Sequence, residues 1–533
     1  MDTKQNSVIP LVVGVTGHRD LRAEDIPALE AAVKRQLQQL QQQYPHSPIH
    51  MLNALAAGGD QLCARVALSL QIPLYCPLPM EEAEYCKDFT ADELTQYRAL
   101  RNAAAEVFVA PHIEPEQPER DYLYRQAGIY VAANCHVLLA LWDGTPGKPD
   151  GCGTAEAVDF MRKGCYRGAP LFLPANDGAV IHIATPRASK GQSFPVTETL
   201  LENERGALHT VLSQTERYNR DVCRIKPDGG WPLLAEEYLQ APIISRLHAV
   251  YLAADQLSLY WQKRYLRIIG ALSAFSVLLA LFYLLYGSVG NYAFLMGYSA
   301  VMLLYILFYR FIARRQQHDK YLQYRTLAEV LRVQLYLHAI GVEGCVCDDF
   351  TWTQKHDATW VKEAVCALLI GAPEEAGVSP DVVKAVWIDG QRDYHAKAGK
   401  RDGKNHRAKE RTTGAMLKGI VVLWLVVLVM ATLFRTALET AVLGLALRSW
   451  FDILWGCLSV VTVFVAGYYG KLSLERKSED HEKMHEFFAM ASQRYDSDPD
   501  SRTELFRLLA REELIENGNW VSYCRENKPD FSV

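Results

Sequence analysis

Residues 268–309 read IIGALSAFSVLLALFYLLYGSVGNYAFLMGYSAVMLLYILFY and contain no charged side chain. At about 1.5 Å of rise per residue this stretch makes roughly 60 Å of helix, enough for two crossings of a ~30 Å hydrocarbon core. Gly287, Gly290 and Asn291 lie near its centre and supply a turn. A buried helical hairpin of a soluble domain normally keeps a polar stripe, and neither half has one. The sequence therefore predicts a helical hairpin in a membrane.

A second pair of apolar stretches follows nearer the C-terminus. Residues 419–434 and 453–470 carry no charge, so four membrane helices are predicted in all. The connector 435–452 interleaves charged residues with leucine and valine. It fits an interfacial amphipathic helix, which is the preferred interpretation, or an extension of the third span.

Basic residues precede the first and third spans and follow the second and fourth. In a topology of two hairpins, all these ends lie on the same side of the membrane. The basic residues are Lys263, Arg264, Arg267, Arg310, Arg314, Arg315, Lys397, Lys400, Arg401, Lys404, Arg407, Lys409, Arg411, Lys418, Lys471, Arg476 and Lys477. Because loops rich in Lys and Arg stay in the cytoplasm, we expect this side to be cytoplasmic. The N-terminal MDTKQNSVIP has no basic-then-apolar signal sequence. We therefore expect a multi-pass protein whose soluble domains are cytoplasmic.

The N-terminal region has the pattern of a parallel α/β sheet. Apolar, strand-like runs at 8–17 and 49–60 end in small residues or glycines, and further runs lie at 73–79, 106–111 and 136–144, with helical patterns between several of them. Strand, glycine turn and helix recurring at this interval predict a Rossmann-like, doubly wound parallel sheet. Ligands of such sheets bind at the carboxyl ends of the strands. The glycine turns are therefore the candidate site.

Three of these turns carry the candidate ligand-binding residues. They are Gly14, Thr16, Gly17, His18, Arg19, Gly58, Gly59, Asp60, Gly151, Gly153, Thr154 and Glu156. Asp143, at the end of the strand-like run 136–144, is a further candidate. Glycines let backbone amides approach a phosphate, while a threonine hydroxyl and an arginine bind it directly. Asp60 suits a ribose diol or a helix cap. One such turn is more often structural, but three in one sheet predict a ligand that contains phosphate and ribose.

Composition narrows the functional classes. A net charge of −5 argues against nucleic acid as the main partner, because a phosphate-binding surface needs a basic excess. The 12 cysteines are scattered without a C-x-x-C pair, which favours reduced cytosolic thiols over a metal site. The spans hold almost no ionisable residue, which argues against an ion-coupled transporter.

The motifs GVTGHRD (14–20), AAGGDQ (56–61), LLALWDG (138–144) and DGCGTAEAV (150–158), in this order, resemble the SLOG superfamily over residues 8–205. That superfamily includes LOG-type phosphoribohydrolases, DprA-like DNA-processing proteins and nucleotide-sensing domains of bacterial conflict systems. The rest of the chain resembles SLATT-type transmembrane effectors, through its hairpins and the helical patterns at 316–340 and 475–515.

One departure from the LOG pattern bears on catalysis. LOG enzymes carry P-G-G-x-G-T-x-x-E, whose last glutamate helps to cleave an N-glycosidic bond. Aligned on Gly153 and Thr154, that position is Ala157, and Glu156 lies one residue early. One residue turns a helical side chain by about 100°. We therefore assign no catalytic residue and expect binding rather than hydrolysis.

The resemblance implies a membrane effector of a bacterial anti-phage (abortive infection) system in the inner membrane. Its SLOG-like domain would bind a nucleotide second messenger, such as an ADP-ribose derivative, a cyclic nucleotide or a nucleoside monophosphate. Binding would make the transmembrane helices oligomerise or rearrange and permeabilise the membrane. The expected partners are the lipid bilayer, further copies of the chain and a signal-producing enzyme, with no nucleic acid, metal or other cofactor. The alternatives are a membrane-anchored nucleotide or NAD N-glycosidic hydrolase using Glu156, Asp60 and Asp143, and a membrane scaffold.

The predicted parts are a SLOG-like sensor (8–205), a linker and juxtamembrane helix (206–267), hairpin one (268–312), a cytosolic helical insertion with a basic loop (313–415), hairpin two (416–471) and C-terminal helices (472–533). The helix at 235–267 runs into the first span and fits a transmitter or a tether equally. The basic stretch 395–412 is predicted to be a solvated loop that attracts anionic lipid in preference to nucleic acid. Trp352, Trp360 and Trp387 indicate a folded insertion of unassigned role.

Overall fold

A computed structural model gives the fold. It describes residues 7–111, 119–147, 151–163, 178–202, 206–313, 316–351, 354, 358–372, 377–442, 444–472 and 474–526. The chain divides into two compact units. The first comprises Met1–Leu257, Gln323–Ser379 and Phe506–Gly518, and the second comprises Ser258–Leu322, Pro380–Leu505 and Asn519–Val533. The first unit is thus larger than the predicted domain 8–205, because helical segments from distant parts of the sequence fold with it.

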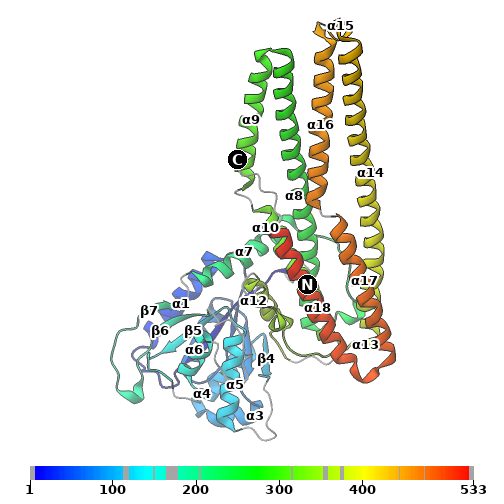
Figure 1. Ribbon diagram of the computed structural model, residues 1–533. Helices are drawn as coiled ribbons and strands as arrows, with labels where there is room; N and C mark the ends of the chain where they lie inside the picture. The colour runs from blue at the N-terminus through cyan, green and yellow to red at the C-terminus, as the bar shows by residue number, and fades with distance from the viewer. Residues whose placement is uncertain are drawn as a thin grey trace. The chain divides into compact units, whose positions relative to one another are not determined.

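A seven-stranded sheet forms the centre of the first unit (Figure 1). Across the sheet the strands are β4 (Glu106–Val109), β3 (Leu74–Leu78), β2 (Ile49–Leu52), β1 (Leu11–Gly17), β5 (Val137–Trp142), β6 (Ala179–Ala184) and β7 (Glu198–Leu201). All neighbours pair in parallel except β6 and β7. The predicted parallel α/β sheet is confirmed, with one antiparallel strand at its edge.

Helices connect these strands and cover the sheet. They are α1 (Ile26–Gln43), α2 (Gly59–Ser69), α3 (Glu82–Tyr85), η2 (Cys86–Asp88), α4 (Ala91–Ala103), α5 (Arg120–Ala133), α6 (Thr154–Lys163), η3 (Ala188–Lys190), α7 (Ala207–Ile225), η4 (Glu236–Tyr238), η5 (Val346–Asp349) and α12 (Thr359–Leu368). The beginning of α8 (Pro242–Val289) and parts of α10 (Gln317–Ala339) and α18 (Arg502–Glu526) also belong to this unit.

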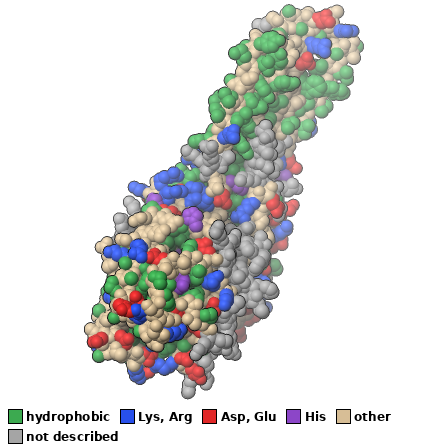
Figure 2. All heavy atoms as spheres, turned by 90° about the vertical axis from the view of Figure 1, so that its left-hand side faces the viewer, with side chains coloured by type: hydrophobic (Ala, Val, Ile, Leu, Met, Phe, Trp, Pro, Cys, Tyr) green, Lys and Arg blue, Asp and Glu red, His purple; other side chains and the backbone are tan. Residues whose placement is uncertain are grey.

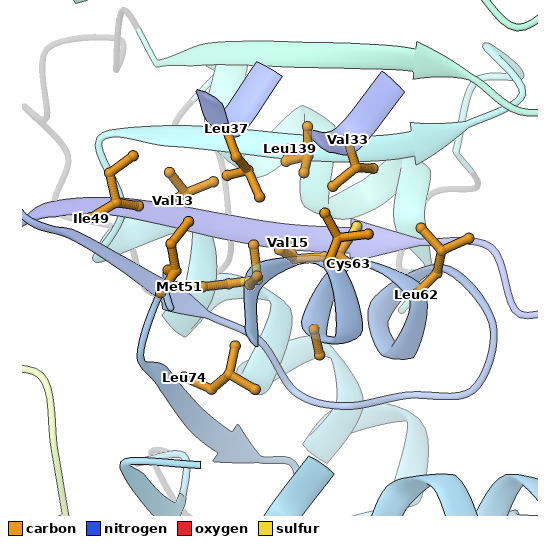
Figure 3. Packing of buried hydrophobic residues seen from close by; sticks show 14 of the residues in the cluster. Val13, Val15, Val33, Leu37, Ile49, Met51, Leu62, Cys63, Leu74 and Leu139 are labelled. Carbon is orange, nitrogen blue, oxygen red and sulfur yellow. The ribbon is translucent and has the colours of Figure 1, made fainter. Parts of the chain in front are cut away.

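The alternation of apolar side chains along β1 builds two cores, one on each face of the sheet. Val13 and Val15 pack with α1 and α2, and Figure 3 shows them in one cluster with Leu37 and Leu62. Val12 points to the other face and packs with α5 and α6. Successive strand residues point to opposite faces, so a continuous apolar run is what a strand covered on both faces requires.

The strand order places a change of direction between β1 and β5. From β1 the chain adds β2, β3 and β4 on one side, and then returns to add β5 and β6 on the other. In open α/β sheets, ligands bind at such a switch point, outside the carboxyl ends of the strands. The loops that follow β1 and β5 therefore flank the candidate site.

The second unit is mostly helical. It contains the later part of α8, α9 (Tyr292–Ala313), α13 (Pro380–Val383), the π-helical η6 (Lys384–Asp389), α14 (Gly390–Leu433), α15 (Arg435–Leu438), α16 (Leu447–Leu472), α17 (Leu474–Ser497) and η7 (Pro499–Ser501), with the short strands β8 (Ala441–Val442) and β9 (Leu445–Ala446). Within the described residues, four helices are long and apolar enough to cross a membrane, and at most 11 % of the most apolar part of any of them is buried. Figure 2 shows hydrophobic side chains crowded over this helical part. Such exposed apolar helices are consistent with a membrane protein and are not typical of a soluble hairpin.

Both turns between the apolar helices can be followed in the backbone. The predicted first turn is confirmed at Gly290, which takes a φ of +71°, and at Asn291, since α8 ends at Val289 and α9 begins at Tyr292. Gly287, which was also predicted to be part of the turn, lies within α8. The connector 435–452 is not the single interfacial helix that was preferred. It consists of one helical turn and a two-residue β-ladder before α16 starts at Leu447. Arg435 to Leu438 is too short an apolar face to form a surface helix.

The basic stretch 395–412 is helical, not the predicted loop. It lies inside α14, which runs unbroken from Gly390 to Leu433. Its glycines serve helix packing: a Cβ on Gly399 would lie 3.5 Å from the His481 Cβ of α17, and one on Gly403 would lie 3.1 Å from the Ser478 Oγ. Close packing against α17 thus offsets the low helix propensity of glycine.

Replacing Gly17 by alanine is expected to destabilise the first unit. The new Cβ would lie 2.8 Å from the Gly59 Cα, a backbone atom that cannot move aside. Overpacking of this kind costs about 1–3 kcal/mol. The control is Gly128→Ala in α5, where the Cβ would meet only the Ala157 Cβ at 3.9 Å. Thermal unfolding of the full chain in detergent should show a lower midpoint for Gly17→Ala alone, and equal midpoints would contradict this account of the contact.

Candidate functional site

The loop after β1 lies directly against the first turn of α2. The Gly59 amide donates a hydrogen bond of 2.9 Å to the His18 carbonyl. Gly17 and Gly59 face each other, and a Cβ on either would lie 2.8 Å from the Cα of the other. Gly58 has a φ of +80°, and a Cβ there would lie 2.6 Å from the His18 oxygen. These three predicted glycines are therefore required for the close packing of the loop after β1 against the start of α2.

The other predicted glycines also make room for protein atoms. A Cβ on Gly14 would lie 2.7 Å from the Cys135 Sγ, so this glycine lets α5 approach β1. A Cβ on Gly151 would collide with the Glu156 carboxylate. That carboxylate folds back over the turn and accepts a 2.9 Å hydrogen bond from the Gly153 amide. Glu156 thus caps the start of α6, where an anion is favoured by the helix dipole.

A polar network centred on Asp143 occupies the switch point. Its side chain is 1 % exposed and accepts from Lys190 Nζ at 2.8 Å and from the Thr145 amide at 3.0 Å. His18 Nε2 lies 3.2 Å from the Asp143 Oδ1 and accepts a 3.0 Å hydrogen bond from the Asp143 amide. Accepting that bond requires a ring nitrogen without its proton. Gln192 adds a further donor at 3.3 Å.

The charges in this network follow from burial and from its hydrogen bonds. Burial lowers the pKa of His18, and Asp143 only partly opposes this. Burial alone would raise the pKa of Asp143, but hydrogen bonds from Lys190 and Thr145 hold it well below its usual range. At neutral pH the network therefore contains a neutral imidazole, a carboxylate and an ammonium group, and it is balanced without a ligand.

Arg19 is the cation that this network leaves uncommitted. Its guanidinium carbon lies 5.1 Å from the centre of the Tyr124 ring, a cation–π contact. Within the described part of the chain, no salt bridge joins Arg19 to a carboxylate. Burial lowers the pKa of Arg19, but the hydrogen bond with Tyr124 and the electrostatic interactions with Tyr124, Tyr85 and Asp60 outweigh this and raise it. Arg19 is thus a positioned charge at the carboxyl end of β1.

Asp60 is buried in the first turn of α2. It is 5 % exposed, and its Oδ1 has no hydrogen-bond partner among the described residues. Burial raises the pKa of Asp60 to about 7, although Arg19 and the amides of Ala56 and Gly17 act to lower it. A buried carboxyl oxygen without a donor is unfavourable, so Asp60 gains either from a proton or from a ligand hydroxyl group.

The structure brings together the predicted residues of the first two turns and Asp143, since β2, β1 and β5 are neighbours. Thr16 is half-buried on β1 and Thr154 is buried in α6. Lys190, Gln192 and Tyr124 were missed by sequence reasoning. Their positions carry no local motif, and only the order of the strands and helices brings them to this edge.

The described residues hold no metal-binding cluster, and one cavity among them lies away from this edge. Among the described residues, no group of three or more His, Cys, Asp or Glu side chains is arranged to hold a metal ion. A cavity of about 270 Å³ lies elsewhere, between α1, β7 and the start of α7, lined by residues such as Tyr44, Glu198 and His209. The chemistry at the switch point therefore rests on the side chains described above.

Comparison of the sequence with protein-family models and with curated proteins finds no match. The functional argument consequently depends on the fold and on the geometry of the switch point.

Asp60 is expected to make stability depend on pH. Its folded pKa of about 7 lies above its ordinary value of 3.8, so the folded chain holds the extra proton between these values. Stability from this group is therefore greatest at low pH and is lost as the pH rises through 7, by up to a few kcal/mol. Asp60→Asn removes the ionisation. Between pH 5 and pH 8 the unfolding midpoint of the wild type should therefore fall relative to that of Asp60→Asn.

The matched control for that measurement is Asp159→Asn, which replaces an exposed carboxylate of α6 that pairs with Lys163. Its midpoint should follow the wild type across the pH range. A constant difference between Asp60→Asn and the wild type would show that Asp60 is already ionised when buried.

Proposed function

We propose that this chain is a ligand-responsive membrane effector. The α/β unit binds a nucleotide-derived anion at the switch point, and the four apolar helices cross the bilayer as two hairpins. Ligand binding changes the arrangement of these helices and makes the membrane permeable. The anti-phage context comes with the resemblance to SLOG and SLATT proteins.

The observation that supports ligand binding most directly is the state of Arg19. Most other charges at this edge are balanced by protein partners, as in the pairs of Lys190 with Asp143 and of Arg187 with Asp20. Arg19 is held over Tyr124 at the place where open α/β sheets bind ligands, and among the described residues it forms no salt bridge with a carboxylate. A phosphate oxygen is the partner that such a guanidinium favours. The unpartnered oxygen of Asp60 suits a ribose hydroxyl of the same ligand.

The glycine turns themselves do not support phosphate binding as strongly as the sequence implied. A Cβ on any of the predicted glycines would lie within 3.1 Å of another atom of the protein. The first-turn amide of Gly59 is already bonded to the protein. The proposal therefore depends on the side chains of Arg19, Asp60 and Thr16 rather than on free backbone amides.

The geometry favours binding over N-glycosidic hydrolysis. Glu156 caps α6, Asp143 is paired with Lys190, and Asp60 is buried. Ala157, at the position of the LOG glutamate, is 5 % exposed on the buried face of α6. Two of these carboxylates are thus held by protein groups, and position 157 has none, so the acid of the LOG pattern is missing. Asp60 keeps an oxygen without a partner among the described residues, and the proposal assigns this oxygen to a ribose hydroxyl rather than to bond cleavage.

Helix α8 is the element that can couple the site to the membrane. It runs unbroken from Pro242 to Val289, from residues that fold with the sheet into the first apolar span. Near its start Arg246 donates a 2.6 Å hydrogen bond to the Ile370 carbonyl, and the Val250 carbonyl accepts one of 3.2 Å from the Tyr218 hydroxyl. A helix fixed in this way moves with the α/β unit.

The test uses the full chain in liposomes loaded with a fluorescent dye. ADP-ribose, cyclic dinucleotides and nucleoside monophosphates are added singly, with binding followed by calorimetry and ligand turnover by chromatography. We expect one ligand class to bind and release dye without being consumed. Arg19→Ala should weaken that binding about ten- to a hundred-fold, because it removes a charge-assisted hydrogen bond of about 1.5–3 kcal/mol.

The control variant is Arg101→Ala, which removes an exposed arginine of α4 that pairs with Glu82. It should bind and leak like the wild type. Tight binding with consumption of the ligand and no leak would replace this proposal by the hydrolase alternative, and unchanged affinity in Arg19→Ala would move the site away from β1.

A further inference from the structure

The part of α14 that precedes the third apolar span carries a stripe of positive charge. Its members recur three or four residues apart, which places them on one face of the helix. They are Lys397, Lys400, Arg401, Lys404, Arg407 and Arg411, and all are exposed. Arg401 pairs with its neighbour Asp402. Within the described part of the chain, Lys397, Lys400 and Lys404 have no acidic partner.

The opposite face of α14 is the one that packs against α17. His395 and His481 approach with their Nδ1 atoms 2.9 Å apart, and Ser478 Oγ donates to the Gly399 carbonyl over 3.2 Å. Ala398 is buried on the same side. Lys397 and Gly399 are two residues apart, and two residues turn a helix by about 200°. The basic stripe therefore points away from α17.

Helix α17 carries a complementary acidic stripe. Glu479, Glu482 and Glu486 are exposed and recur at helical spacing. None of the three has a salt-bridge partner within the described part of the chain. Glu482 and Glu486 each follow a residue that packs on α14, namely His481 and His485. One residue turns the helix by about 100°, so the acidic stripe points to the side of the pair and not toward α14.

The two stripes lie at the same level of the helix pair. Because α14 and α17 are antiparallel, the contacts of Gly399 with Ser478 and of His395 with His481 fix their register. Lys397 and Lys400 therefore bracket the level of Glu479, and Glu482 lies about half a turn beyond the level of Lys397. Helical side chains tilt toward the N-terminus of their own helix, which brings lysines of α14 and glutamates of α17 closer in level.

We propose that the basic stripe of α14 docks against the acidic stripe of α17 in a second copy of this chain. The two stripes of one chain point in different directions, so they cannot satisfy each other. Copies in one bilayer share the same orientation and height, which aligns stripes of equal level. Such an interface joins two different surfaces, so each end of a dimer still has one unused stripe. Further copies can add in the same way, and they close into a ring if the rotation between neighbouring copies permits it. The inference deepens the proposed effector function by naming the surface of its oligomer.

Lipid headgroups are the competing partner for these cations. They can reach Arg411 and Lys418, which precede the apolar stretch that begins at residue 419. Lys400 lies 19 residues before that boundary, roughly 28 Å along the helix. Electrostatic attraction in physiological salt falls off over about 8 Å. A membrane surface therefore cannot neutralise Lys397 and Lys400, whereas an acidic stripe at their own level can.

The test is carbodiimide cross-linking, which joins a lysine amine to a carboxylate without a spacer. Full-length chain labelled with ¹⁵N is mixed with unlabelled chain and reconstituted into nanodiscs. Mass spectrometry should find mixed-isotope peptides that link Lys397 or Lys400 to Glu479 or Glu482. The double reversal Lys397→Glu/Lys400→Glu should lower the cross-linked fraction roughly ten-fold, and so should Glu479→Lys/Glu482→Lys.

Combining the two reversals restores opposite charges and should return the cross-linked fraction to within about two-fold of the wild type. Lys34→Glu, on the exposed surface of α1, is the control and should have no effect. Absence of mixed-isotope links in the wild type, or failure of the combined variant to recover, would overturn the interface. Loss of binding to phosphatidylglycerol vesicles with an unchanged oligomer would assign the stripe to lipid instead. Ligand binding is measured on the same variants. A failure of the proposed ligand site can therefore be distinguished from a failure of the proposed interface.

Discussion

A hydrocarbon environment admits helices only where their backbone groups are bonded internally and their side chains are apolar. Four helices of this chain meet that condition, and almost none of their apolar surface is covered by the protein. The constraint shapes the segments beside them. The first turn is reduced to Gly290 and Asn291, whose side chain accepts from the Ala293 amide at 2.9 Å and starts α9. Charged residues lie outside the apolar stretches, and in α14 the basic stripe precedes the apolar stretch that begins at residue 419.

The α/β unit obeys a different constraint, that of a sheet buried on both faces. The glycines are needed where the layers approach closely. Gly14 leaves room for α5, and Gly17 and Gly59 leave room for α2 to pack against β1. A small set of polar side chains lies at the carboxyl edge of the sheet, and these side chains differ in how many hydrogen-bond partners the protein gives them. Asp143 accepts from several donors, whereas Asp60 has an oxygen without a partner among the described residues and Arg19 contacts the Tyr124 ring instead of a carboxylate. Because Asp60 and Arg19 have fewer protein partners than Asp143, the switch point is a candidate site for a ligand.

Much of the fold could be predicted because its signals are local. Charge-free stretches and apolar runs before glycine report membrane helices and buried strands directly. The helix over 395–412 was missed because Gly399 and Gly403 look like loop residues, while their role is to admit α17, which is about 75 residues away in the sequence. The glycine turns were assigned to a ligand because a phosphate and a neighbouring helix make the same demand on a residue, namely the absence of a Cβ. Lys190 could not be found at all, since only the strand order brings it to Asp143.

The central claim is that the apolar helices form two membrane hairpins, with the α/β unit and the charged ends of the helices on one side. Labelling with a membrane-impermeant maleimide tests it most directly. Ser288→Cys reports the first hairpin turn, and the native Cys223, which is exposed and free, reports the α/β unit. In sealed cells the account predicts modification at position 288 and none at Cys223, which should react only after the membrane is permeabilised. Modification of Cys223 in sealed cells, with position 288 protected, would contradict it.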